Sequence, residues 1–403
     1  MADFFRLFAG ITLLGLAATT ALPTPGRALW GASVAATEFG YWLAILALLP
    51  AIPTKSRTRP GRIGSMLSLA SIPLLILPAY RAHEEGAKLP SAFESRFGAE
   101  RRVRVPAAQD PRPEPLVWTE LLTSLNLPPV RYEQHVFTQR DNQKLSFDLF
   151  RPAYVHAPIP AVIVVHGGGW QTGDSLDYRA LNAYLASRDY VVISINYREA
   201  PKFRFPAQRD DVYAAIAYVK THAADFGVDP ARLVLLGRSE GGQLALLAAY
   251  TAGEPSIRGV ISLYAPTDLR VAYEHPTAAW MSDTRNALEQ FMGGSPAKVE
   301  QAYFDASPIN FVSAASPPTL LIHGLRDELV PADQSARLDD RLNQAGVKHL
   351  YIKLPWATHA CDQSFAGPCG QITTYAVERF LDAVTIPPPP DPLPAAKRKL
   401  AKR

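Results

Sequence analysis

The sequence has few cysteines and no large excess of charge of either sign. Its 403 residues include two cysteines, Cys361 and Cys369, so at most one disulfide can form within the chain. They are eight positions apart, and in an oxidising compartment we expect a local disulfide, with two free thiols as the alternative. Lysine and arginine total 41 against 37 aspartates and glutamates. This balance argues against a chain-wide positive field, and no nucleic-acid partner is expected.

Charge is also nearly absent from three apolar runs in the first eighty residues. Residues 7–22 and 63–80 have no charged side chain, and residues 28–52 have only Glu38. Each run is close to the length that crosses a bilayer as a helix. We therefore predict that residues 1–80 form a membrane region with about three transmembrane helices, and that the lipid bilayer is a partner. A cleaved signal peptide is the alternative for the first run.

The charges between these runs predict how the chain crosses the membrane. Lys55, Arg57, Arg59 and Arg62 make residues 53–62 the most basic short loop, and the positive-inside rule places such a loop in the cytoplasm. With three spans, the N-terminus is then also inside. Everything after residue 80 is outside, which predicts a multi-pass membrane protein with its larger part on the extracytoplasmic side.

Composition divides the remainder of the chain into three parts. Residues 81–130 are rich in proline, arginine and glutamate, and predict a linker or cap segment whose first part is a charged, helical stretch. Residues 387–403 begin with four prolines and end in basic residues, and predict a disordered tail. Residues 131–386, between them, have the regular pattern of a folded domain.

In this domain short apolar runs alternate with longer helical patterns. Residues 144–152 alternate like an exposed strand, whereas five continuous apolar runs predict buried parallel strands. Helical patterns between the runs supply the crossovers that parallel strands need. The prediction is an α/β domain with a mostly parallel sheet and helices on both faces, whose ligands bind beyond the carboxyl ends of the strands. The five runs are residues 161–167, 191–197, 233–237, 259–265 and 319–324, and the helical patterns are residues 177–188, 208–227 and 242–253.

A glycine-bounded serine follows one of these runs. Gly237, Arg238, Ser239, Glu240 and Gly241 come directly after a buried strand and before a helical pattern. A nucleophile on a sharp strand-to-helix turn needs neighbours without a Cβ, so that its oxygen stands exposed above the sheet. Ser239 is therefore the predicted nucleophile.

A second glycine-rich stretch follows an earlier strand. His166 is followed by three glycines, and the backbone N–H groups of Gly168 and Gly169 are expected to bind the oxyanion of an acyl-transfer reaction together with the N–H of Glu240. His166 itself is expected to orient this stretch through hydrogen bonds.

A serine nucleophile needs a histidine base and an orienting carboxylate, in the chain order serine, acid, histidine. Of the four histidines after Ser239, His275 precedes any plausible acid, His323 ends a strand ahead of the acidic loop, and His349 opens a strand. His359 lies on the loop beyond that strand and is the predicted base.

The acid is expected in the loop after residues 319–324. Asp327 follows this strand directly, whereas Asp333 and Asp339 fall in the next helical pattern. Asp327 is the predicted acid and Glu328 the second choice, while an ion pair with Arg326 is the alternative role for Asp327.

These motifs are similar to those of a known group of enzymes. Residues 134–384 resemble α/β-hydrolase carboxylesterases of the hormone-sensitive-lipase and feruloyl-esterase-like groups, through "HGGGWQTGD", "INYREAPKFRFPAQRDD", "DPARLVLLGRSEGG", "LLIHGLRDELVP" and "LPWATHA". The resemblance implies an α/β-hydrolase fold and the roles assigned above to Ser239, His359 and Asp327. The sequence departs from the family pattern at Arg238 and Glu240, which leaves the choice of substrate open.

The function expected from these features is hydrolysis of small-molecule esters by a membrane-anchored serine esterase that forms an acyl-enzyme and needs no cofactor or metal. An acyltransferase would use the same triad with a different acceptor. A binding module on the hydrolase fold is the alternative from another class, although such modules usually lack a triad member. The oligomeric state and the acyl and alcohol specificity are not predicted.

Overall fold

The computed structural model describes residues 1–24, 26–52, 58–99, 112, 114–123, 129–154 and 158–386. The tail predicted at residues 387–403 lies outside these ranges. Lys55 and Arg57 of the basic loop and part of the predicted linker also lie outside them.

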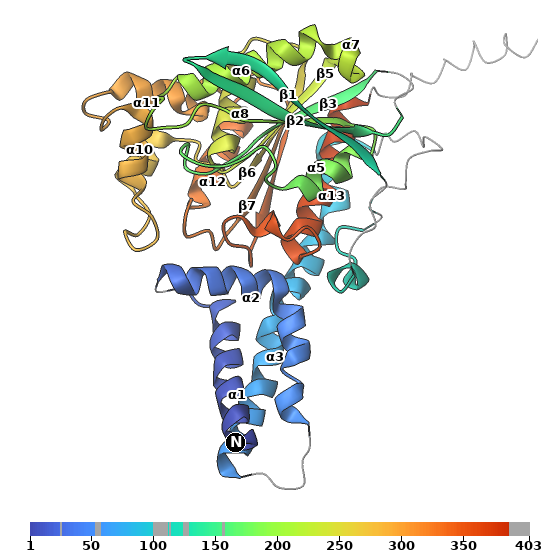
Figure 1. Ribbon diagram of the computed structural model, residues 1–403, viewed down its shortest axis with the longest axis vertical. Helices are drawn as coiled ribbons and strands as arrows, with labels where there is room; N and C mark the ends of the chain where they lie inside the picture. The colour runs from blue at the N-terminus through green and yellow to red at the C-terminus, as the bar shows by residue number, and fades with distance from the viewer. Residues whose placement is uncertain are drawn as a thin grey trace, which may run out of the picture.

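Eight strands in the described residues form one sheet, in the order β1-β2-β4-β3-β5-β6-β7-β8 (Figure 1). β2 pairs antiparallel with β1 and with β4, and every other neighbouring pair is parallel. The predicted mostly parallel sheet is confirmed, and the five predicted runs correspond to β3 to β7. The strands are β1 (Val130–Arg140), β2 (Gln143–Pro152), β3 (Ile159–Val165), β4 (Val191–Ile195), β5 (Val228–Arg238), β6 (Ile257–Leu263), β7 (Thr319–Gly324) and β8 (His349–Leu354).

The prediction that residues 144–152 form an exposed strand is wrong in one respect. They lie in β2, but β2 lies between β1 and β4, and Phe147, Asp148, Leu149 and Phe150 are all buried. The alternating pattern arises because Asp148 is polar yet buried. Its carboxylate accepts hydrogen bonds from the hydroxyls of Tyr132 and Ser175.

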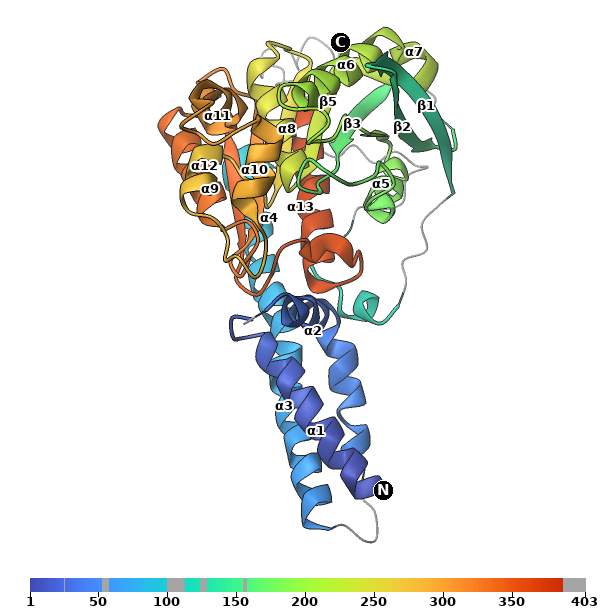
Figure 2. The ribbon, with the colours of Figure 1, turned by 60° about the vertical axis from the view of Figure 1, so that its left-hand side comes forward.

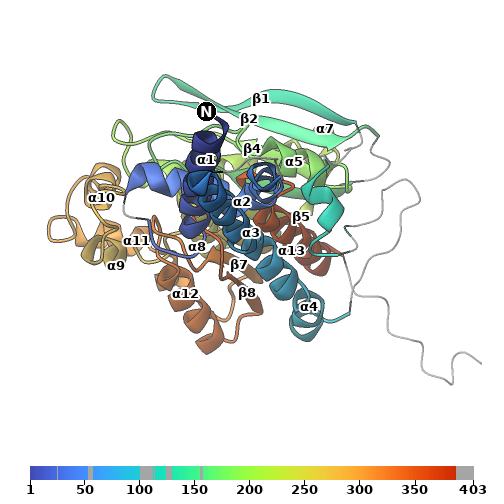
Figure 3. The ribbon, with the colours of Figure 1, turned by 90° about the horizontal axis from the view of Figure 1, so that it is seen from below.

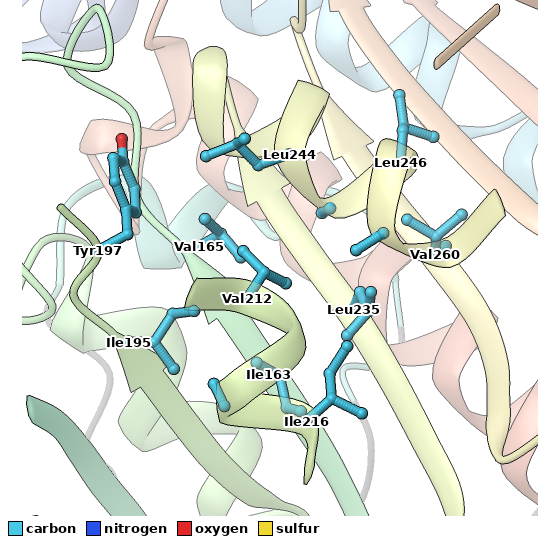
Figure 4. Packing of buried hydrophobic residues seen from close by; sticks show 14 of the residues in the cluster. Ile163, Val165, Ile195, Tyr197, Val212, Ile216, Leu235, Leu244, Leu246 and Val260 are labelled. Atoms are coloured by element: carbon cyan, nitrogen blue, oxygen red, sulfur yellow. The ribbon is translucent and has the colours of Figure 1, made fainter. Parts of the chain in front are cut away.

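Helices cover both faces of the sheet because successive residues of a central strand point to opposite sides. On β3, Ile163 packs with the core shared with α6, α8 and α12, whereas Val162 packs with the core shared with α5 and α13. Figure 4 shows Val212 and Ile216 of α6 over Ile163. The helices after β3 are α5 (Arg179–Ala186), α6 (Ala207–Thr221), α7 (Ala223–Phe226), α8 (Glu240–Thr251), α9 (Leu269–Glu274), α10 (Thr284–Met292), α11 (Glu300–Ala306), α12 (Asp333–Gln344) and α13 (Pro368–Thr385).

A bundle of N-terminal helices projects from one end of the α/β domain (Figures 1 and 2). Within the described residues, α1 (Ala2–Thr19), α2 (Arg27–Leu46, extended by a short 3-10 turn, Leu49–Ala51) and α3 (Arg59–Gly86) are long and apolar enough to cross a membrane. Many apolar side chains on the outside of the bundle are exposed, including Phe8 and Met66. Figure 3 looks along the bundle toward the α/β domain.

Small and hydroxylated residues allow these helices to pack closely. A Cβ on Gly10 of α1 would lie 2.2 Å from the carbonyl oxygen of Gly64 on α3, so only glycine fits at this contact. Ser68 of α3 donates a hydrogen bond to the carbonyl of Ala47 beside α2, at 2.8 Å. Both features are typical of helices that associate in a membrane, where the hydrophobic effect does not hold them together.

The start of the predicted linker or cap segment is helical, as expected, and it packs against the α/β domain. α3 continues to Gly86, and α4 (Leu89–Phe97) follows it along the α/β domain. The ring of Phe97 meets that of Phe380 on α13 edge to face, with 5.5 Å between centroids. Leu89 and Phe93 are buried in the same core. The charged residues of α4, Glu94 and Arg96, are exposed on its other face.

Candidate active site

Ser239 lies on the sharp turn between β5 and α8. Its backbone has φ 51° and ψ −124°, a left-handed conformation that a residue with a Cβ rarely adopts. The turn is tight because α8 starts close to the strand before it, and a Cβ on Gly237 would lie 2.1 Å from the carbonyl oxygen of Gly241. The side chain of Ser239 is thereby presented at the carboxyl end of the sheet.

His359 connects Ser239 to Asp327. Its Nε2 lies 3.0 Å from the hydroxyl oxygen of Ser239, and its Nδ1 lies 2.7 Å from Oδ2 of Asp327. The structure therefore brings together all three predicted triad residues. The other carboxylate oxygen of Asp327 accepts hydrogen bonds from the backbone N–H groups of Leu329 and Val330, at 2.9 and 2.8 Å.

Buried charges set the protonation states of this pair. Burial alone would raise the pKa of Asp327, but the two histidines that it contacts, His359 and His323, outweigh burial, so its pKa is well below the ordinary value and it stays ionised. Burial lowers the pKa of His359, and the negative charge and hydrogen bond of Asp327 raise it by more. The net result is an imidazole whose pKa lies above its ordinary value.

A further histidine touches the acid. His323, at the end of β7, is fully buried, and its Nε2 lies 3.2 Å from Oδ2 of Asp327. Its Nδ1 lies 2.7 Å from the hydroxyl of Ser335 on α12. The only sign of this contact in the sequence is the spacing of four residues between His323 and Asp327.

The other candidates have partners elsewhere. The carboxylate of Glu328 accepts hydrogen bonds from the backbone N–H and hydroxyl of Thr24, so it faces the helical bundle. His349 pairs with Asp339, with 3.0 Å between Nε2 and Oδ1. His275 lines the cavity above Ser239 without a contact to a carboxylate among the described residues.

The glycines expected to bind an oxyanion are bound to a carboxylate. The backbone N–H groups of Gly168 and Gly169 donate to Oε2 of Glu240, at 3.1 and 2.8 Å. Both N–H groups therefore point toward one carboxylate oxygen, and Glu240 occupies their site in this structure.

His166 supports the glycine stretch, as expected. Its ring stacks on that of Tyr197 with 4.3 Å between centroids, and its Nδ1 lies 2.8 Å from the carbonyl oxygen of Gly167. Burial lowers the pKa of His166, so the ring is neutral.

Arg238, one of the two departures from the family pattern, joins the serine turn to the histidine loop. Its Nε lies 2.7 Å from Oδ2 of Asp362, and both side chains are buried. Its guanidinium also lies over the ring of Tyr178, 3.9 Å from the centroid. The hydroxyl of Tyr264 donates to Oδ1 of Asp362, at 2.6 Å. Arg238 therefore has a structural partner three residues from His359.

The histidine loop is closed by a disulfide between Cys361 and Cys369. Both cysteines are buried, and the segment between them leads into α13. The disulfide starts two residues after His359 and ends at the first turn of this helix, so it limits how far the loop can move.

The helical bundle contacts the loop with Asp327 and the start of α13, which follows the loop with His359. Arg326, next to Asp327, donates hydrogen bonds to the carbonyls of Thr19, Thr20 and Leu22, where α1 ends, at 2.8, 2.6 and 2.8 Å. Glu38 of α2 accepts a hydrogen bond from the backbone N–H of Cys369, at 3.3 Å. Glu38 is the one acidic side chain of the second apolar run, and it is buried at the N-terminus of α13.

A cavity of about 730 Å³ opens above Ser239. Its size lies within the range of small-molecule sites. Besides Ser239, His359 and the glycine stretch, its lining includes apolar residues from α9, α10 and the Asp327 loop, and two residues from the start of α2. The apolar lining residues include Val271, Met281, Leu288, Leu329 and Val330, and those from α2 are Arg27 and Trp30.

Comparisons with known proteins agree with this fold. Residues 147–342 match the BD-FAE family. The probable carboxylic ester hydrolase LipM of Mycobacterium tuberculosis is 29% identical over 380 residues, which cover 88% of this chain and 86% of LipM. Since 88% of the chain is more than residues 130–403 comprise, this match extends into the N-terminal region.

Two further matches cover smaller shares of the chain. Esterase LipC of the same organism is 31% identical over 56% of this chain, and the chain covers 59% of LipC. Among solved structures, an esterase from Pyrobaculum calidifontis has a TM-score of 0.56 at 25% identity, over 65% of this chain and 88% of that one. The sheet and its helices therefore form an α/β-hydrolase fold.

Proposed function

We propose that this chain, which has a BD-FAE domain and is homologous to carboxylic ester hydrolases, is a membrane-anchored serine esterase that works through an acyl-enzyme. Ser239 is the proposed nucleophile, His359 the base and Asp327 the residue that orients it. The observation that carries the proposal is the position of His359, whose ring nitrogens lie within hydrogen-bond distance of Ser239 and Asp327.

In the proposed first half of the reaction, the Ser239 hydroxyl attacks the carbonyl carbon of an ester while Nε2 of His359 takes its proton. The carbonyl π electrons move to the oxygen, which becomes an oxyanion held by the N–H groups of Gly168, Gly169 and Glu240. When the tetrahedral intermediate collapses, the bond to the alcohol breaks and His359 gives the alcohol oxygen the proton.

In the second half, water attacks the acyl-enzyme with His359 again as the base. The bond to Ser239 breaks, the acid leaves, and the serine hydroxyl is restored. Throughout, ionised Asp327 stabilises the positive charge on His359. The carboxylate of Glu240 must leave the two glycine N–H groups before an ester carbonyl can take its place.

The proposed chemistry is tested by p-nitrophenyl butyrate hydrolysis with the full-length protein in detergent. His359→Ala is expected to lower kcat at least a thousandfold, as removing a triad base does. The matched control is His349→Gln, because His349 also pairs with an aspartate but lies away from Ser239; it should keep kcat within about threefold. More than a tenth of wild-type activity in His359→Ala would refute the assigned base.

We further propose that α1, α2 and α3 cross a membrane and that the α/β domain lies on the extracytoplasmic side. Three observations support this: the apolar length of the helices, the arginines at the α3 end of the basic loop, and a disulfide in the domain, which persists in an oxidising compartment. Alkaline phosphatase fused after Arg403 should be active in a bacterial host, and a fusion after Arg57 should be inactive. The reverse pattern would place the domain in the cytoplasm.

A further inference from the structure

The start of α2 is part of the wall of the catalytic cavity. Arg27 and Trp30 line the same cavity as Ser239 and His359, although they belong to a helix of the apolar bundle. Figure 1 shows α2 beginning across the end of the bundle, between α1 and the α/β domain. The cavity therefore opens where the bundle and the domain meet.

This place is also where a bilayer surface would lie if the bundle crosses a membrane. Tryptophan and arginine are typical of the membrane–water interface, because each has an apolar part and a polar end. Leu22 and Leu29, on either side of the α1–α2 turn, are 60% and 45% exposed. Apolar side chains are thus exposed next to the residues of α2 that line the cavity.

Hydrogen bonds from the α/β domain hold the turn between α1 and α2, and with it the start of α2, in place. Arg326 binds the carbonyls at the end of α1, and Glu328 binds Thr24. These residues flank Asp327, so the loop with the catalytic acid also fixes the segment that leads to Trp30. A lid that opened freely would not have such contacts.

We propose that the substrates are esters with long acyl chains that reside in the bilayer, and that they reach Ser239 from the membrane along Trp30. This rests on the proposed function, since it needs both the triad and the membrane position. The cavity favours such a chain because its wall includes Val271, Met281 and Leu288. The indole N–H of Trp30 is buried and has no hydrogen-bond partner among the residues that the structure describes. A polar oxygen of a bound lipid would satisfy it.

The test compares two esters of one fluorogenic alcohol, 4-methylumbelliferyl oleate and 4-methylumbelliferyl acetate, with the full-length protein in phosphatidylcholine vesicles. The oleate partitions into the bilayer, whereas the acetate is delivered from water. Trp30→Ala should lower kcat/KM for the oleate at least tenfold more than it lowers kcat/KM for the acetate. The acetate rate also reports that the variant is folded.

Trp42→Ala is the matched control. Trp42 lies on the same helix and is 44% exposed, but does not line the cavity, so both rates should stay within about twofold of the wild type. An unchanged oleate rate in Trp30→Ala, or an equal fall for both esters, would overturn the proposed entry route. A wild-type protein that hydrolyses neither ester would instead refute the esterase function.

Discussion

Arg238 and Asp362 form a buried ion pair, with 2.7 Å between Nε and Oδ2, that links the serine turn to the loop with His359. The departure from the family pattern at Arg238 left the choice of substrate open. In the structure, the guanidinium of Arg238 is paired with a buried carboxylate. Arg238 thereby holds the turn with Ser239 and the loop with His359 in fixed positions relative to each other.

Arg238→Met is expected to destabilise the protein by about 3 to 5 kcal/mol, because it leaves Asp362 buried without its cation. Urea denaturation of the wild type and variant measures the difference. Arg270→Met removes an exposed ion pair with Glu274 and should change the midpoint little. Equal midpoints for Arg238→Met and wild type would show that the buried pair does not stabilise the fold.

Glu240→Ala is expected to raise kcat/KM for a neutral ester at least tenfold. In the structure the carboxylate of Glu240 holds the N–H groups of Gly168 and Gly169, and hydrogen bonds to a charged group contribute about 1.5 to 3 kcal/mol each. Alanine keeps the backbone N–H of residue 240 and frees the other two. Steady-state kinetics on p-nitrophenyl butyrate measure the change, and a fall in kcat/KM would mean that the carboxylate assists catalysis.

The turn with Ser239 and the loop with Asp327 show what the sequence could and could not predict. The strand, turn and helix around Ser239, and the order of Ser239, Asp327 and His359, follow from local patterns, because a parallel sheet gathers the carboxyl ends of its strands at one edge. The contacts of Arg326 and Glu328 could not be predicted in this way, since their partners lie on a turn about three hundred residues away in the chain.

Glu240 and Glu38 were unpredictable for a similar reason. The sequence places Glu240 after the nucleophile, but its side-chain conformation, which takes the carboxylate to the glycine stretch, depends on the cavity around it. Glu38 appeared as an isolated charge in an apolar run. Its partner is the start of α13, which only the packing of α2 against the α/β domain brings near.

The pKa of His359 predicts the acid side of the pH profile. His359 must be neutral to accept the serine proton, so kcat/KM falls as pH falls through its pKa. Because Asp327 raises this pKa above the ordinary 6.5, with Glu240 and Asp362 acting in the same direction, half-maximal activity is expected above pH 6.5. In the residual activity of Asp327→Asn the midpoint should move to lower pH. A midpoint that stays in place would exclude Asp327 as the cause.

The disulfide is expected to affect the histidine loop more than the global fold. A ring of this size restricts the unfolded chain by about 2 to 3 kcal/mol, whereas a shift of about 1 Å in a catalytic group can lower the rate a hundredfold. Replacing both Cys361 and Cys369 by serine should therefore lower kcat by at least tenfold at a temperature where circular dichroism shows a folded protein. An unchanged kcat would show that packing alone positions His359.

Mass spectrometry after reaction with diethyl p-nitrophenyl phosphate is a direct test of whether Ser239 is the nucleophile that forms a covalent acyl-enzyme. A serine activated by His359 displaces nitrophenolate from this reagent and keeps the diethyl phosphoryl group. One added group per chain is expected, located on Ser239 in the peptide digest, together with complete loss of esterase activity and no label in Ser239→Ala. A label on another residue with activity lost, or full activity in Ser239→Ala, would show that Ser239 is not the nucleophile.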